Sequence, residues 1–316
     1  MTLRRGALIG VIFFVIAVLA AGCGGEDGGT AAPEYSGQWD TGGANFGKID
    51  HPEGVEVGAR GGLLVADTWN DRILVASRDG TVSEALGEYG GEPGELQCPR
   101  SVTTDNGGNI YVVDTWNHRV QKFSPTGKLL LELGSYGGPW GSDEADGKFS
   151  YPYGAAVDSE GNIYVSDFNN NRIQKFDAQG KFVMKWGTEG RQDGQVSHPA
   201  GMAIDNKNRL YLADLGNGRI QRFTTNGKFD GKIEDDSLSE PYDVAVDANG
   251  DIYAVDFGSH QVRKYSPSGR LIWALGERGS DQGQFEMPLS VAVDEDGVVY
   301  VSDWGNNRIQ SFMPTS

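Results

Sequence analysis

The sequence predicts an all-β fold: a six-bladed β-propeller of four-stranded antiparallel blades, closed by the N-terminal strand joining the C-terminal blade. Three observations predict it: a strand pattern that recurs six times, 47 glycines in 316 residues, and an incomplete set of strands at each end of the repeat array. Glycine at about twice the ~7% of an average protein disfavours helices and supplies turns. Four antiparallel strands recurring every 40 to 50 residues are typical of propeller blades.

Two markers define the repeat. The first is an aspartate that ends an apolar strand, and it recurs at Asp67, Asp114, Asp167, Asp214, Asp256 and Asp303. The second is a proline that opens another strand, and it recurs at Pro52, Pro99, Pro152, Pro199, Pro241 and Pro288. Both series advance by the same intervals of 47, 53, 47, 42 and 47 residues, so chance similarity does not explain them.

The third repeat shows the four strands most clearly. We expect its first strand at 155–157 and its second at 163–166, joined by a turn rich in Asp and Gly. The third is expected at 172–176 and the fourth at 182–186, where apolar residues alternate. No segment of the repeats has helical periodicity, which excludes a helical solenoid.

The two ends of the chain predict how the ring closes. The sixth repeat has three strands and then the chain stops at Ser316, whereas 35–39 is a fourth strand without a blade of its own. We therefore expect 35–39 to complete the sixth blade, which leaves no open sheet edge between the first and last blades.

The first 22 residues resemble a bacterial lipoprotein signal peptide. Arg4 and Arg5 precede an apolar run that ends in small residues just before Cys23. The resemblance implies that the chain is cut before Cys23, that this cysteine carries lipid, and that the protein is anchored to the outer face of the cell membrane. An uncleaved membrane helix is the alternative. Residues 23–34, rich in Gly and small residues, are expected to be a flexible tether.

The charge of the chain excludes one large class of function. The formal net charge is −17, with 44 acidic and 27 basic residues. Nucleic-acid binding relies on clustered Lys and Arg that neutralise phosphates. We therefore expect no nucleic-acid partner.

Three motifs within the repeats resemble NHL repeats: Pro-x-Gly-x-Ala-Val-Asp, Gly-Asn-Ile-Tyr-Val-x-Asp and Asn-x-Arg-Ile-Gln-x-Phe. The resemblance covers residues 35–316 and implies the propeller fold. It does not specify a function, because NHL propellers include ligand sensors, RNA-binding modules, protein-docking modules and a zinc-dependent amidating lyase.

The recurring Asp, Asn and Arg, such as Asp67, Asn70 and Arg72, invite a catalytic or metal-binding interpretation. A chemical site needs unlike groups that converge once, so repetition in nearly every blade favours a structural role. We expect turn capping and ion pairs between neighbouring blades. The fifth repeat carries Ser259 and Gln261 instead, so we expect that blade to lack the arginine link.

Candidate binding residues are those at which the repeats differ. The residue after the repeat proline is Glu53, Arg100, Tyr153, Ala200, Tyr242 or Leu289. Because innermost strands line the channel of a propeller, we expect these residues to ring its mouth. There the acid, the base and the two tyrosines could orient a small polar ligand, or Glu53 and Arg100 could form an ordinary ion pair.

Aromatic residues in the turn between the second and third strands form a second candidate group. They are Trp69, Trp116, Phe168, Phe257 and Trp304. We expect them on the same face as the channel mouth, where aromatics can anchor a peptide, a glycan or a partner protein. Trp69, Trp116 and Trp304 are the candidates for partner binding.

Enzymatic alternatives find weaker support. The NHL-like amidating lyase binds zinc through histidines that follow the repeat proline, and none of the six positions here is His. A lactonase-like hydrolase would hold a divalent ion with a Glu, an Asn and an Asp in the channel. Glu53 and Asp243 are candidates for that set without a third member. Cys98 precedes a repeat proline and is expected to be packed away.

The sequence thus predicts an exported, lipid-anchored, monomeric module for binding or sensing, without catalysis, metal or cofactor. Its expected partner is a cell-envelope protein, a peptide or a small polar ligand. A metal-dependent lyase or hydrolase with its site in the central channel is the alternative.

Overall fold

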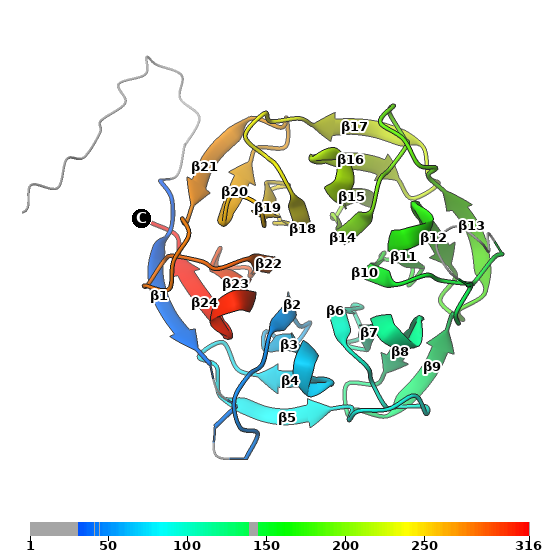
Figure 1. The fold of residues 1–316 in the computed structure, drawn as a ribbon, viewed down its shortest axis with the longest axis horizontal. Helices are drawn as coiled ribbons and strands as arrows, with labels where there is room; N and C mark the ends of the chain where they lie inside the picture. The colour runs from blue at the N-terminus through cyan, green and yellow to red at the C-terminus, as the bar shows by residue number, and fades with distance from the viewer. Residues whose placement is uncertain (1–30, 41, 44, 139–144, 316) are drawn as a thin grey trace, which may run out of the picture.

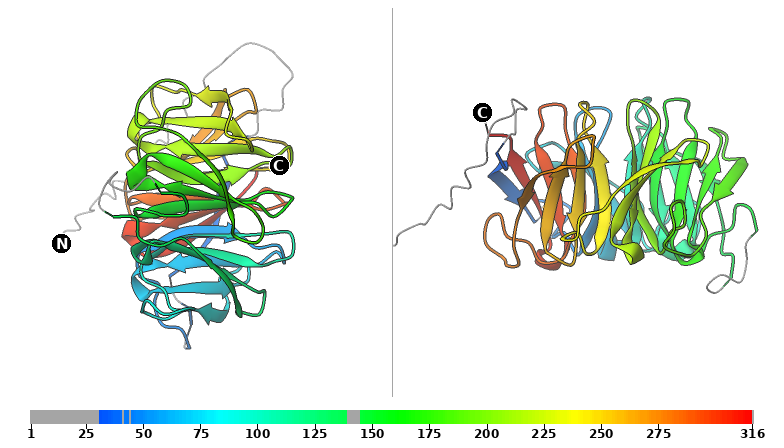
Figure 2. Two further views of the ribbon diagram at one scale, coloured as in Figure 1. Left: turned by 90° about the vertical axis from the view of Figure 1, so that its right-hand side faces the viewer. Right: turned by 90° about the horizontal axis from the view of Figure 1, so that it is seen from above.

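Six four-stranded antiparallel sheets stand around a central axis (Figure 1). The computed structural model describes residues 31–40, 42–43, 45–138 and 145–315, and within them the predicted six-bladed β-propeller is confirmed. Seen edge-on, the blades form a flat ring (Figure 2). The predicted signal peptide 1–22, Cys23 and most of the predicted tether lie outside the described residues.

Blades 1 to 5 are each one continuous run of four strands. Blades 1 to 3 consist of β2 (Pro52–Val57), β3 (Leu63–Asp67), β4 (Arg72–Ala76), β5 (Val82–Leu86), β6 (Pro99–Thr104), β7 (Ile110–Asp114), β8 (Arg119–Phe123), β9 (Leu129–Leu133), β10 (Pro152–Val157), β11 (Ile163–Asp167), β12 (Arg172–Phe176) and β13 (Phe182–Trp186). Blades 4 and 5 consist of β14 (Pro199–Ile204), β15 (Arg209–Asp214), β16 (Arg219–Thr224), β17 (Phe229–Ile233), β18 (Pro241–Val246), β19 (Ile252–Asp256), β20 (Gln261–Tyr265) and β21 (Leu271–Leu275).

Blade 6 draws its strands from both ends of the chain. It consists of β22 (Pro288–Val293), β23 (Val299–Asp303), β24 (Arg308–Met313) and β1 (Glu34–Trp39). In every described blade except the fifth, one turn of 3-10 helix joins the second strand to the third: η1 (Thr68–Asn70), η2 (Thr115–Asn117), η3 (Phe168–Asn170), η4 (Leu215–Asn217) and η5 (Trp304–Asn306).

The repeat proline and aspartate mark one face of the ring. Each inner strand starts at its proline, and the antiparallel second strand returns to end at its aspartate, as in the pairing of Pro52 with Asp67. The turn after that aspartate, and the loop from each outer strand to the next blade, lie on this same face. We call it the top face.

Pairing of β1 with β24 closes the ring, as predicted. Tyr35 pairs with Phe312 and Trp39 with Ile309, so the first described strand becomes the outer strand of the last blade. Figure 1 shows the blue β1 beside the red β24. A hydrogen bond spans the same junction on the top face, where the His51 backbone N–H donates to Asn307 Oδ1 at 2.7 Å.

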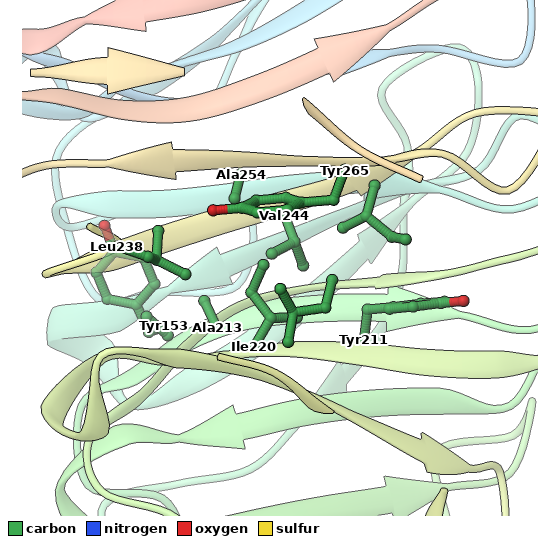
Figure 3. Packing of buried hydrophobic residues seen from close by; sticks show 11 residues of the cluster. Tyr153, Tyr211, Ala213, Ile220, Leu238, Val244, Ala254 and Tyr265 are labelled. Carbon is green, nitrogen blue, oxygen red and sulfur yellow. The ribbon is translucent and has the colours of Figure 1, made fainter. Parts of the chain in front are cut away.

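The hydrophobic core lies between neighbouring blades. Between blades 4 and 5, Tyr211 and Ile220 pack with Val244, Ala254 and Tyr265, all of them buried (Figure 3). Equivalent clusters occupy the other interfaces, so each blade buries one face against the preceding blade and one against the next. This explains why second strands such as β3 and β11 are buried at every position.

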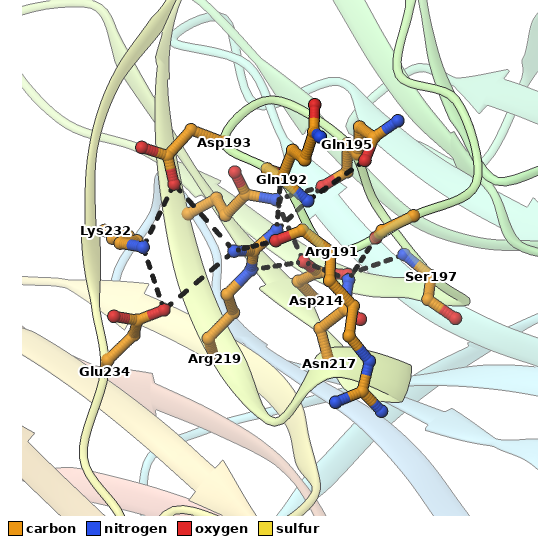
Figure 4. Close-up of polar contacts among 12 residues, drawn as sticks. Arg191, Gln192, Asp193, Gln195, Ser197, Asp214, Asn217, Arg219, Lys232 and Glu234 are labelled. Atoms are coloured by element: carbon orange, nitrogen blue, oxygen red, sulfur yellow. Dashed lines mark hydrogen bonds and ion pairs between the residues drawn. The ribbon is translucent and has the colours of Figure 1, made fainter.

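The recurring aspartate and arginine form an ion pair inside one blade, so the predicted ion pairs between neighbouring blades are wrong. In blade 4, Arg219 Nε donates to Asp214 Oδ2 at 2.8 Å, and Arg219 Nη2 donates to the carbonyl oxygens of Gln192 and Gln195 (Figure 4). Those carbonyls belong to the loop that arrives from blade 3. The aspartate also accepts a hydrogen bond from the Ser197 backbone N–H at 2.7 Å, so this pair anchors the connection between blades.

Blade 5 retains an arginine link, contrary to expectation. Arg263 lies two positions further along the third strand than the usual arginine, with its Nε 3.4 Å from Asp256 Oδ2. Its Nη2 donates to the Ser237 carbonyl at 2.8 Å, which again holds the incoming loop. Ser259 Oγ donates to Asp256 at 2.6 Å where the other blades use Asn. A side chain from a different position therefore reaches the same aspartate.

A search of the described residues for a helix long and apolar enough to cross a membrane finds none.

The closure can be tested at Trp39. Its ring packs against the tip of the hairpin of blade 1 at Gly80, a contact that Trp186 and Gly227 repeat between blades 3 and 4. Because Trp39 is partly buried against the core of blades 6 and 1, Trp39→Ala should lower the free energy of unfolding by about 2–3 kcal/mol in chemical denaturation. Val183→Ala, on the exposed outer strand of blade 3, is the control, with an expected change below about 0.5 kcal/mol. Equal stability of the two variants would contradict the role of β1.

Candidate functional site

The inner strands of all six blades surround a cavity of about 300 Å³ on the axis of the ring. These strands are β2, β6, β10, β14, β18 and β22 (Figure 1). Its lining is mostly small or apolar, and the charged residues Glu53, Glu56, Arg100 and Asp243 stand out among them. The cavity is the central channel in which the sequence placed a binding site.

Four of the residues that follow the repeat proline contact one another at the mouth of the channel: Glu53, Arg100 and Tyr153 line it, and Tyr242 packs against Tyr153. Tyr153 Oη donates to Glu53 Oε2 at 3.3 Å, and Arg100 Nε lies 3.5 Å from the same oxygen. The Arg100 guanidinium lies over the Tyr153 ring, 5.2 Å from its centroid, and the Tyr242 ring meets that ring edge-on at 5.4 Å. The predicted cluster of acid, base and two tyrosines therefore exists, and so does the predicted Glu53–Arg100 ion pair.

Glu53 and Arg100 are unequally buried. Glu53 is only 6% exposed, and burial raises its pKa although Arg100, Tyr153 and His51 act in the opposite direction. The Arg100 side chain is 30% exposed, yet its Nε is buried and has no hydrogen-bond partner in the described chain. The pair is thus a long contact that leaves donors of the guanidinium unused.

Two further carboxyl groups line the channel below the mouth. Glu56 lies three positions after Glu53 on β2, and Thr103 Oγ1 donates to it at 3.4 Å. Asp243 on β18 accepts a hydrogen bond from Ser290 Oγ at 2.5 Å. Glu56 was not predicted, although the sequence holds a signal for it. The other five repeats place a small residue at this position: Thr103, Ala156, Ala203, Ala245 and Ala292.

Asp243 occupies a position that the other repeats reserve for Gly or Ser. The equivalent residues are Gly54, Ser101, Gly154, Gly201 and Ser290. Neighbouring inner strands approach closely at this level, and a Cβ added to Gly201 would overlap the Asp243 carboxylate. Glycine at position 201 therefore makes room for the carboxylate that the next blade places in the channel.

Burial changes the acidity of both groups. Burial and the nearby Asp243 raise the pKa of Glu56 to about 8, and burial raises the pKa of Asp243 to about 7 despite its hydrogen bond from Ser290. No ion pair is formed by either group within the described residues. The described part of the chain contains no group of three or more His, Cys, Asp or Glu arranged to hold a metal ion.

The three predicted tryptophans of the top face differ in exposure. Trp69 is 56% exposed and stacks on His51 at 3.8 Å, and Trp116 is 51% exposed. Trp304 is partly buried, meets the His51 ring edge-on at 4.5 Å, and has a buried Nε1. The structure therefore leaves Trp69 and Trp116 available to a partner and packs Trp304 at the junction of blades 6 and 1.

Exposed aromatic side chains gather on one side of the top face. In the part of the chain that the structure describes they are Trp69, Tyr89, Trp116, Tyr136 and Tyr151. All five belong to blades 1 to 3 or to the loops between them. The three tyrosines were not predicted, because Tyr89 and Tyr136 lie in loops for which the repeat gives no rule. We call these five residues the aromatic sector.

Cys98 lies at the edge of this region and is unsuited to act as a nucleophile. Burial and the nearby Asp71 raise the pKa of its thiol to about 11, and the Cys98 backbone N–H donates to Asp71 Oδ1 at 2.8 Å. The thiolate is the reactive form of cysteine, so a raised pKa disfavours reactivity.

The fold and the site together define a six-bladed β-propeller with a polar axial channel and an aromatic sector on one face. Comparison with known proteins adds the repeat family: residues 96–123, 149–176, 197–223, 238–265 and 285–312 match the NHL repeat model. Each match spans the first three strands of blades 2 to 6. The chain therefore contains NHL repeats. Blade 1 keeps the same strands but has Leu64 and Leu74 where its neighbour has Tyr111 and Gln121.

Proteins similar to this chain include one that matches a short segment of its sequence and two that match its structure. The Drosophila melanogaster protein brain tumor is 43% identical over 47 residues, which are 15% of this chain and 4% of that protein. Virginiamycin B lyase from Staphylococcus aureus has a TM-score of 0.60 at 16% identity, covering 88% of this chain and 87% of the lyase. A gluconolactonase from Xanthomonas campestris has a TM-score of 0.64 at 14% identity, covering 84% and 87%. The identities of 16% and 14% to these two enzymes show a shared fold alone.

The channel carboxyls make the stability of the fold depend on pH. Both pKa values are raised on folding from ordinary values of 4.5 and 3.8, so folding favours the protonated forms. Their contribution is complete below about pH 4 and is lost as the pH rises through 7 and 8. The unfolding free energy of the wild type should therefore fall between about pH 5 and pH 8. In the double variant Glu56→Gln, Asp243→Asn this fall should be smaller by about 1–3 kcal/mol.

Urea denaturation at the two pH values measures this difference. The matched control is Glu84→Gln, which changes an exposed glutamate on β5. An identical pH slope for the double variant and this control would show that the channel carboxyls do not cause the dependence.

Proposed function

We propose that this chain is an exported, lipid-anchored binding module, without catalysis of its own, whose top face holds a protein of the cell envelope. The observation that carries the proposal is the aromatic sector, which places five exposed rings on one side of one face. Tryptophan and tyrosine are enriched among the residues that dominate binding energy at protein interfaces. An exposed apolar patch confined to one region of an acidic chain is typical of an interaction site.

The arrangement of the sector supports a partner that extends over more than one blade. Trp69 belongs to η1 of blade 1, Trp116 to η2 of blade 2, and Tyr151 precedes the inner strand of blade 3. His118 links blades 2 and 3, because its Nδ1 accepts a hydrogen bond from the Tyr151 backbone N–H at 3.0 Å. The rings are therefore presented by a fixed framework, which reduces the entropy lost on binding.

A lyase or lactonase acting in the channel is the second candidate, favoured by the carboxyl groups of Glu53, Glu56 and Asp243 that line it. Solved structures of similar fold include virginiamycin B lyase and a gluconolactonase. A histidine-to-alanine variant of that lyase is catalytically inactive, whereas none of the four histidines of this chain lines the channel. Among the described residues, no group of three or more His, Cys, Asp or Glu is placed to hold a metal ion. Binding is therefore the better supported function.

The aromatic sector predicts the outcome of a capture experiment. The double variant Trp69→Ala, Trp116→Ala should lose at least about tenfold in affinity for a protein captured from cell-envelope extract, because two exposed rings each contribute about 1 kcal/mol or more. The control is Leu130→Ala on β9, a side chain 49% exposed and outside the sector. Affinity is measured with the captured protein after purification. A double variant that binds as tightly as the Leu130 variant would refute the proposed surface.

The proposed anchor predicts a change of location. Cys23→Ser should move the protein from the membrane fraction to the soluble extracytoplasmic fraction, because the acyl chains supply the membrane affinity. Fractionation and labelling with radioactive palmitate measure the change, and Cys98→Ser is the control with the other cysteine altered. Retention of the Cys23 variant in the membrane would contradict the anchor and favour an uncleaved helix.

A further inference from the structure

The guanidinium of Arg100 donates no hydrogen bond, unlike the other buried or partly buried arginines among the described residues, of which Arg263 alone shares an unpartnered Nε. Its side chain is 30% exposed, and it donates no hydrogen bond to any described residue. Arg78, Arg209 and Arg222 are 32%, 23% and 26% exposed, and each donates hydrogen bonds to carboxylates. Arg219, in the repeat position, donates to a carboxylate and to three carbonyl groups.

The surroundings of Arg100 cannot satisfy it. Glu53 is its nearest carboxylate, but the 3.5 Å separation is too long for a good charge-assisted bond, and Tyr153 Oη already donates to the same oxygen. The face of the Tyr153 ring covers one side of the guanidinium and offers no acceptor. Buried guanidinium nitrogens without partners cost free energy, so such a group is expected to have an acceptor in the functional state.

The other donor at the mouth is also unused. The Tyr242 hydroxyl makes no hydrogen bond within the described residues, and Arg100 is the nearby cation that most lowers the pKa of Tyr242 against the effect of burial. The Tyr153 and Tyr242 rings meet at 5.4 Å and are backed by Phe168 and Phe257, at 5.9 and 5.1 Å. The mouth thus combines a rigid aromatic wall with a planar fork of N–H donors and a free hydroxyl.

We propose that the mouth of the central channel binds a carboxylate group, held by the Arg100 guanidinium and the Tyr242 hydroxyl. A planar guanidinium matches a carboxylate through two parallel hydrogen bonds. A group of higher charge is disfavoured, because Arg100 is the one base in the channel lining and Glu53, Glu56 and Asp243 are close by. The ligand therefore bears one negative charge at this point.

This inference rests on the proposed binding function and names the chemistry that the channel mouth adds to it. A carboxylate can come from the C-terminus of a polypeptide or from a small organic acid. His51 links the mouth to the aromatic sector, because it stacks on Trp69 and is close enough to Glu53 to lower the pKa of that carboxyl. A polypeptide could therefore reach both places.

The experiment follows the Arg100 side-chain Nε–H resonance in the ¹⁵N-labelled mature protein. The resonance is assigned by its loss in Arg100→Lys. Three probes are titrated: N-acetyl-triglycine, its C-terminal amide, and acetate. We expect a saturable shift with N-acetyl-triglycine and none with the amide, because only the acid carries the carboxylate. Tighter binding of the peptide acid than of acetate assigns the site to a polypeptide terminus, and equal binding assigns it to a small organic acid.

Variants separate binding from folding. Arg100→Gln should lose at least about tenfold in affinity for the peptide acid, and Arg270→Gln, an exposed arginine on the outer hairpin of blade 5, should retain it. Glu53→Gln should tighten binding several-fold, because it removes the competing carboxylate and leaves the shape of the side chain. The thermal unfolding of each variant shows whether it is folded, and Glu53→Gln tests the proposal even if Arg100→Gln does not fold.

Absence of a saturable shift with both acids, or an equal shift with the amide, would overturn the proposal. Suppose that the Trp69, Trp116 double variant loses partner capture and that neither acid shifts the Arg100 resonance. The protein-binding function would then be supported and the carboxylate site refuted. A saturable shift with the acids in a protein that captures no partner would support the carboxylate site and refute the protein-binding function.

Discussion

Pairing of β1 with β24 is the constraint on which the rest of the structure depends. Each blade buries its two faces against its neighbours, so an open ring would expose two apolar faces and the edge of the last sheet. The pairing supplies the fourth strand of blade 6, and the bond from His51 to Asn307 spans the same junction on the top face. Because the ring is closed, six inner strands are forced to surround one axis, and the channel follows from that geometry.

The fold was predictable because the residues that define the repeat act on the local backbone. A proline opens each inner strand, an aspartate ends each second strand, and both recur at matching intervals. The functional surface was harder to predict, because it depends on the angular position of side chains around the ring. Glu56 and Asp243 are four blades apart along the chain, yet Asp243 helps to raise the pKa of Glu56 across the channel. No local pattern in either repeat reports that proximity.

The arginine link of blade 5 escaped prediction for a physical reason. The aspartate at the end of each second strand requires a partner because it is fully buried, but it does not specify which residue provides one. Arg219 reaches Asp214 from the start of the third strand, whereas Arg263 reaches Asp256 from two residues further on, on the same face of its strand. Period-two alternation in a strand makes those two positions interchangeable for this purpose, so a motif search sees a missing arginine where the structure has a displaced one.

Repetition also separates structure from function within the molecule. Arginines of the repeat each donate several hydrogen bonds, because each holds the loop that arrives from the preceding blade. Arg100 stands outside the repeat pattern, one residue after Pro99, and its donors are left unused. Glu56 and Asp243 likewise replace residues that are small in the other blades. The departures in blade 5 still hold the incoming loop, whereas those on the axis and in the aromatic sector leave side chains open to a ligand. A ligand that contacts both regions would therefore meet residues that the repeat does not require for its structure.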